Sequence, residues 1–224
     1  LVVGTSAGSL VAALYASGLD GRQLARLALE MDEGAITDWA FPGRGVIRGE
    51  ALARWVRQHT RGRSIEQMPL SLGIVAADLD TGRAVLFRRG DPGTAVRASS
   101  AVPAVFQPVK IGEREYVDGG LVAPVPVRHA REMGAELVIA VDIATPPDGH
   151  PTGDPVSLLL QTFNIMGAAI SRFELREADV VLRPALAGVG SADFAARQRA
   201  IEAGREAALA QLPFIRTRVA QAMQ

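Results

Sequence analysis

The chain has 224 residues, enough for one large α/β domain with a sizeable hydrophobic core. With 48% hydrophobic and 21% charged residues it is globular in composition, and its zero net charge argues against nucleic-acid binding. The absence of cysteine excludes disulfides, thiolate metal sites and cysteine nucleophiles. We expect one domain over residues 1–224.

The first residues contain the most informative pattern in the chain. An apolar run, Leu1–Val3, leads into Gly4-Thr5-Ser6-Ala7-Gly8, and a helix-like stretch follows from Leu10 to Ala16. In a strand–turn–helix context, Gly-x-Ser-x-Gly is typical of a turn that presents a nucleophilic serine above the strand end. The two glycines lack Cβ atoms, so we expect strand and helix to approach closely there. An ordinary glycine-containing turn is the alternative.

The chain starts without an initiator methionine or a signal peptide. Because Leu1 falls inside what looks like a buried strand, we expect preceding sequence, including a first strand, to be missing. No stretch reaches the roughly 18 consecutive apolar residues that a membrane-spanning helix needs.

The remaining elements alternate between helices and strands. Asp20 and Gln23 predict a capping box for the second helix, and 34–49 is a loop with Trp39 and Phe41 as aromatic anchors. Two hairpins are expected, and 137–141 resembles a strand buried on both faces. This alternation predicts an α/β fold around a mostly parallel sheet with hairpin additions. The expected helices cover 20–31, 50–60, 91–98, 127–133, 156–178 and 193–224, the last interrupted at Pro213; the expected strands cover 70–77, 83–88, 108–111, 114–117, 137–141 and 180–183.

A serine hydroxyl needs a base, and the usual base is histidine. His59 is near the end of an exposed-looking helix, and His150 is in a loop rich in proline, glycine and aspartate. His129 follows Asp118, as in a Ser…Asp…His chain order, but it falls on the polar face of a helix. A conventional triad is therefore disfavoured, and an esterase using His129 stays open as an alternative.

Three aspartates follow apolar, strand-like runs: Asp78, Asp118 and Asp142. Asp78 opens a turn that aspartate favours for local hydrogen bonding, and Asp142 could serve a loop or a helix cap. Asp118 differs because Gly119 and Gly120 follow it and clear space around its carboxylate. Burial beside the serine would raise its pKa and make it a usable base. Asp118 is the best candidate base, and a structural turn aspartate is the alternative.

Taken together, these motifs resemble the patatin-like phospholipases, and especially their bacterial members. The resemblance covers nearly the whole chain in order. The segments that carry it are Gly4–Gly8, Asp78–Gly82, Ala95–Pro103, Val117–Val122 with Pro124 and Pro126, and Val189–Phe194.

The resemblance implies a three-layer α/β/α fold and hydrolysis of lipid esters by a Ser–Asp dyad through an acyl-serine intermediate. Ser6 would be the nucleophile and Asp118 the base. The family's glycine-rich oxyanion loop should precede Leu1, so only the Ala7 N–H could contribute a donor from this chain. One lost donor costs about 10²–10³ in rate. A non-catalytic module that binds lipid or protein is therefore the alternative function.

The resemblance also implies a lipid or acyl-ester substrate, no cofactor and a cytoplasmic or peripheral-membrane location, in a bacterium. Neither clustered metal ligands nor a phosphate loop is evident. The apolar stretch Val156–Ile170 could contact a membrane, although packing of an amphipathic helix into the core is favoured. The loop with Trp39 and Phe41 could form a lid.

Overall fold

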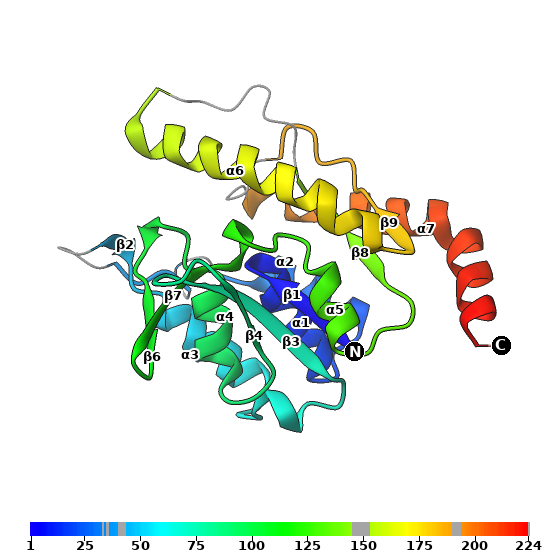
Figure 1. Ribbon diagram of the computed structural model, residues 1–224, viewed down its shortest axis with the longest axis horizontal. Coiled ribbons are helices and arrows are strands. Elements are labelled where there is room, and N and C mark those ends of the chain that lie inside the picture. Colours follow the sequence, from blue (N-terminus) through cyan, green and yellow to red (C-terminus); the bar gives the residue numbers. More distant parts are fainter. Residues whose placement is uncertain (33, 35, 40–43, 145–152, 190–193, 224) are drawn as a thin grey trace.

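The computed structural model describes residues 1–32, 34, 36–39, 44–144, 153–189 and 194–223. A sheet lies between helices packed on its two faces, and a long helix runs along the top of the molecule in Figure 1. This is the three-layer α/β/α arrangement that the resemblance to the patatin-like phospholipases implies.

The central sheet is built around β3 (Leu72–Asp78), whose seven residues are all buried. On one edge, β1 (Val2–Thr5) runs parallel to the first part of β3, and β7 (Arg114–Asp118) runs antiparallel to the last part. On the other edge, β4 (Ala84–Phe87) pairs with β3. On the first edge, β6 (Val109–Ile111) pairs with β7 and extends the sheet beyond it. Because β1 and β7 follow one another along the same edge of β3, their carboxyl ends meet.

Alternating side chains of the strands pack against helices on opposite faces. On one face, Val2 and Ile74 contact α1 (Ala7–Ala16), α3 (Glu50–His59) and α4 (Pro92–Ser99). On the other face, Val3 packs with α5 (Val127–Glu132) and with β8 (Ile139–Val141). This period of two is what a strand buried on both faces requires.

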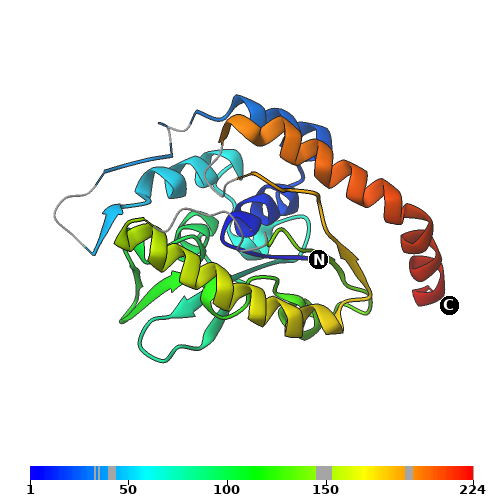
Figure 2. The same ribbon diagram turned by 90° about the horizontal axis from the view of Figure 1, so that it is seen from above.

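Additional elements surround this body. Helix α2 (Gly21–Glu30) begins with the predicted Asp20–Gln23 capping box and packs beside α7 (Arg197–Ala222), as Figure 2 shows. The long helix is α6 (Pro155–Glu174). Two short parallel pairs join β2 (Gly45–Ile47) to β5 (Ala104–Phe106), and β8 to β9 (Val180–Leu182). Single 3-10 turns cover Ile65–Gln67, Gly119–Leu121 (η3), Leu175–Glu177 and Phe194–Ala196.

The α/β class, both hairpins and every predicted helix outside the C-terminal region are confirmed. Parallel pairing contributes less than the sequence predicts: three of the six described strand pairs are parallel, because the hairpins supply antiparallel neighbours. Strands β2 and β5 were not predicted, since three residues are too few for a periodic pattern.

Four finer predictions are wrong. The strand at 137–141 is buried on one face only, because Ile139 and Val141 are 41% and 52% exposed. Leu1, which the sequence placed inside a buried strand, is exposed. Helix α7 continues through Pro213 instead of stopping there, and its red C-terminal part bends (Figure 2). Such a bend is the usual effect of a proline inside a helix. Trp39 is 75% exposed and so is no packing anchor.

Candidate active site

Ser6 lies in a sharp turn between β1 and α1. Its backbone has a φ of 53° and a ψ of −128°, a positive-φ conformation that is uncommon for any residue other than glycine. A Cβ atom at position 4 would lie 2.3 Å from the Gly8 carbonyl oxygen, so glycine is required where strand and helix cross. The predicted close approach of strand and helix is therefore confirmed at position 4, whereas a Cβ at position 8 would meet nothing within 4 Å and glycine is not required there.

Asp118 ends β7 directly beside this turn. The Ser6 hydroxyl donates a hydrogen bond of 2.6 Å to Asp118 Oδ2, and the Gly120 amide donates one of 2.6 Å to Oδ1. Glycine is also required at position 119, because a Cβ there would lie 2.2 Å from the Val75 carbonyl oxygen. The structure thus brings together the two residues that the sequence singled out, 112 positions apart.

The Asp118 carboxyl is buried, with only 6% of the residue exposed. Burial raises its pKa to about 6, and the hydrogen bonds from Ser6 and Gly120 offset part of that rise. A carboxylate with such a pKa accepts protons near neutral pH, which an ordinary aspartate does poorly. The pair therefore combines a serine hydroxyl with a base in direct contact.

Three hydroxyl side chains that the sequence did not identify hold this turn. Ser99 Oγ accepts from the Ser6 amide at 2.8 Å and donates to the Val75 carbonyl at 2.6 Å. Ser9 Oγ donates to the Ser6 carbonyl at 2.6 Å, and Thr5 Oγ1 donates to the Ala123 carbonyl at 2.7 Å. The only signal in the sequence was the run of small residues at 99–103, which indicated close packing near a site.

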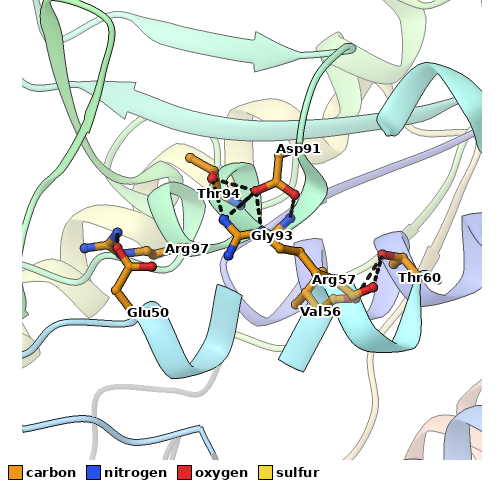
Figure 3. A network of polar contacts seen from close by, with 8 residues as sticks. All are labelled: Glu50, Val56, Arg57, Thr60, Asp91, Gly93, Thr94 and Arg97. Carbon is orange, nitrogen blue, oxygen red and sulfur yellow. Dashed lines mark hydrogen bonds and ion pairs between the residues drawn. The ribbon is translucent and has the colours of Figure 1, made fainter. Parts of the chain in front are cut away.

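Helix α4, which ends at Ser99, is fastened to α3 by two ion pairs (Figure 3). Asp91 caps α4 by accepting from the Gly93 and Thr94 amides, and Arg57 of α3 donates to the same carboxylate at 2.7 Å. Arg97 pairs with Glu50 at the other end. These contacts fix where the last residue of α4 lies.

The other candidate bases lie away from Ser6. His59 stacks on Trp55 and contacts its carbonyl oxygen, and His129 contacts Glu132 on α5. Asp78 holds its own turn and pairs with Arg114, whereas Asp142 pairs with Arg183.

Three features that the sequence singled out lie partly or wholly outside the described residues: His150, Phe41 and most of the Val189–Phe194 segment. Within the described part of the chain, no three acidic or histidine side chains gather as a metal site requires. None of the helices described there is both long and apolar enough to cross a bilayer.

A family model for the patatin-like phospholipases matches residues 1–131, a range that includes both Ser6 and Asp118. The chain belongs to the patatin-like phospholipase family. It is 31% identical over 239 residues to an uncharacterized NTE family protein of Mycobacterium tuberculosis, covering 93% of this chain and 40% of that relative. It is 29% identical over 154 residues to mouse patatin-like phospholipase domain-containing protein 6, covering 65% of this chain and 11% of that relative.

The patatin-like chain therefore spans about 40% of the length of the first mycobacterial relatives. A second group of mycobacterial NTE family proteins, including one of Mycobacterium bovis, is 34% identical over 146 residues, or 63% of this chain. The range that the family model matches contains the turn at Ser6, Asp118 and α4, so it includes the whole candidate site.

Proposed function

We propose that the protein is a serine hydrolase of lipid acyl esters, such as phospholipids or lysophospholipids, with Ser6 as nucleophile and Asp118 as base. The observation that carries the proposal is the 2.6 Å hydrogen bond from the Ser6 hydroxyl to a buried carboxylate. Membership in the patatin-like phospholipase family supports the substrate class.

The chemistry follows from this contact. The Ser6 proton passes to Asp118 Oδ2 while Ser6 Oγ attacks the ester carbonyl carbon. The protonated Asp118 then gives its proton to the leaving alcohol as the C–O bond breaks, leaving an acyl-serine. A water molecule attacks that ester, Asp118 takes the water's proton, and the proton returns to Ser6 Oγ when the fatty acid leaves.

The start of α1 adds electrostatic support for the tetrahedral oxyanion. Helix α1 begins at Ala7, so the amides of its first turn and the positive end of its dipole lie beside the nucleophile. The Ser6 amide is already committed to Ser99, which leaves Ala7 N–H as the donor we assign from this chain. The glycine-rich loop expected before Leu1 would supply the others, and it stays a prediction.

The test is hydrolysis of a short-chain acyl ester and of a phospholipid by the wild type, Ser6→Ala and Asp118→Asn. It uses this chain and any longer natural form that contains it. We expect each variant to lose at least about 10³ in kcat, because neither nucleophile nor base has a substitute in the site. His129→Ala is the control, and it should keep wild-type turnover.

A fluorophosphonate label separates the alternatives. Covalent labelling of the wild type but not of Ser6→Ala would support a nucleophilic serine. Absence of both labelling and hydrolysis in the longest natural form would favour the non-catalytic lipid- or protein-binding module instead. Loss of turnover in His129→Ala would point to the histidine-dependent esterase.

We further infer that α6 brings the site to the lipid surface. Only Ser171 and Glu174 of this helix are buried, so the packing into the core that the sequence favoured is wrong. Apart from Val156 in its first turn, its exposed apolar side chains follow helical spacing along one face. Helix α6 also packs on η3, the turn after Asp118. These exposed residues are Leu158, Leu159, Ile165, Met166 and Phe173.

Cosedimentation with phospholipid vesicles tests this contact. Replacing Ile165 and Met166 by glutamate should reduce the vesicle-bound fraction severalfold, since each buried apolar side chain contributes to interfacial binding. The matched control places glutamates at Leu209 and Phe214, which are similarly exposed on α7. Equal binding by both double variants would reject α6 as the contact surface.

A further inference from the structure

The nucleophile holds an unfavourable backbone conformation that its surroundings must enforce. A left-handed φ of 53° is strained for a serine, and a strained residue stays in place only when several contacts hold it there. Ser9 holds the Ser6 carbonyl from within α1, one turn along the same helix. The Ser6 amide, by contrast, is held by a residue that is distant in sequence, Ser99 at the end of α4.

The Ser99 hydroxyl has a fixed orientation. Ser99 is fully buried, with 0% of its surface exposed, and a hydroxyl has a single hydrogen to donate. That hydrogen goes to the Val75 carbonyl at 2.6 Å, so a lone pair faces the Ser6 amide at 2.8 Å. The hydroxyl thus bridges the nucleophile's main chain to β3.

The base is positioned from the same strand. Asp118 pairs with Ala76, the residue next to Val75, and its amide donates to the Ala101 carbonyl just after α4. The position of α4 is itself fixed by the Arg57–Asp91 contact in Figure 3 and by Gly93, where a Cβ would lie 2.4 Å from the Ala53 carbonyl oxygen. Contacts with β3 and with the C-terminal end of α4 therefore fix the positions of both Ser6 and Asp118.

From this geometry we infer that Ser99 is a positioning residue, whose hydroxyl bridge holds Ser6 in the conformation that aims Oγ at Asp118. The inference rests on the proposed hydrolase function for its kinetic consequence. Ser99 does not touch the reacting atoms; it acts through the Ser6 main chain.

Removing the Ser99 hydroxyl takes this partner from the part-buried Ser6 N–H and from the buried Val75 carbonyl. Ser6 can then relax toward an ordinary backbone conformation, which moves its Oγ from the carboxylate. We expect Ser99→Ala to lower kcat by about tenfold to a hundredfold, with KM changed less than twofold, because misplacement of a reacting atom affects chemistry more than binding.

The variants separate a positioning role from a structural one. Ser99→Cys fills the same space but is a weak hydrogen-bond acceptor, so it should stay as slow as Ser99→Ala. Thr60→Val is the matched control, since it also removes a fully buried hydroxyl that bonds main-chain oxygen, at the end of α3. Rates are expressed per site that reacts with a fluorophosphonate, so that misfolded protein is not counted.

Hydrogen exchange of the Ser6 amide, followed by NMR, gives a readout that needs no turnover. The exchange should be slow in the wild type and in Thr60→Val, and at least tenfold faster in Ser99→Ala. Three results would overturn the positioning role of Ser99. They are a wild-type kcat per labelled site in Ser99→Ala, a kcat in Ser99→Cys that returns to the wild-type value, and an exchange rate of the Ser6 amide in Ser99→Ala that equals that of the wild type. If the wild type neither labels nor hydrolyses, the proposed function fails, and the exchange result still decides whether Ser99 holds Ser6.

Discussion

Two buried carboxylates with opposite surroundings distinguish the candidate site from the rest of the molecule. Glu174 and Asp118 are both almost fully buried, 2% and 6% exposed. Arg128 donates to Glu174 at 2.5 Å, whereas Asp118 receives its hydrogen bonds from the Ser6 hydroxyl and the Gly120 amide. The charge of Glu174 is neutralised by an arginine, whereas the two groups that donate to the Asp118 carboxylate are uncharged.

Two further aspartates behave like Glu174 in having cation partners. Arg114 and the Thr81 amide lower the pKa of Asp78 to about 2, and the Val138 amide with Arg218 and Arg131 lowers that of Asp179 to about 2. Burial without a cation instead raises the pKa of Asp118 to about 6. Stability and reactivity place opposite demands on a carboxylate, and the surroundings of Asp118 fit the base that we propose.

The largest effect should come from neutralising each carboxylate in turn. Because the pKa of Asp118 is higher in the folded chain than in the unfolded one, ionisation of Asp118 costs stability, and this cost develops between about pH 4 and pH 6. We expect Asp118→Asn to raise the free energy of unfolding by about 2 kcal/mol at pH 8 and by nearly nothing at pH 4. Denaturant titration at the two pH values measures this.

Glu174→Gln is the matched control, because it makes the same chemical change at a carboxylate that has an arginine partner. It should lower the free energy of unfolding by about 1–2 kcal/mol, through weakened charged hydrogen bonds from the half-exposed Arg128. Destabilisation by both substitutions would show that Asp118 is a structural residue like Glu174.

How much of the fold and of the candidate site can be predicted from sequence depends on how far apart along the chain the interacting residues lie. Ser6 was identifiable because apolar run, glycines and serine are adjacent, and Asp118 because two glycines follow it. Their meeting depends on the pairing of β1 and β7 along one edge of β3, which residue patterns alone leave open. The family resemblance supplied that connection.

The supporting contacts could not be predicted in the same way. The sequence does not distinguish Ser99 from other small residues, because its proposed positioning role depends on the Ser6 amide 93 positions away. Only the packing of α4 in the folded chain brings the two residues together. Helix α6 was misjudged for a related reason. Its apolar residues fit a buried helix equally well, and only the placement of α6 on η3 leaves one row of them exposed. Periodicity reports an apolar face, but not what covers it.

The pH dependence of hydrolysis sharpens the comparison at the site itself. Asp118 must be ionised to accept the Ser6 proton, so kcat/KM should fall as pH drops through its pKa of about 6. We expect a loss of about tenfold for each pH unit below that value, with a plateau above it. A stopped assay with a short acyl ester, from pH 4 to pH 8, measures the profile.

The midpoint of that profile separates the two kinds of carboxylate. An acidic limb near pH 6 agrees with a buried base that has no cation beside it. A limb at or below pH 4 would mean that Asp118 titrates like the arginine-paired Asp78 and Asp179, and the electrostatic argument for its role would fail. Fluorophosphonate labelling of Ser6 over the same range should follow the same curve, because both reactions need the same proton acceptor.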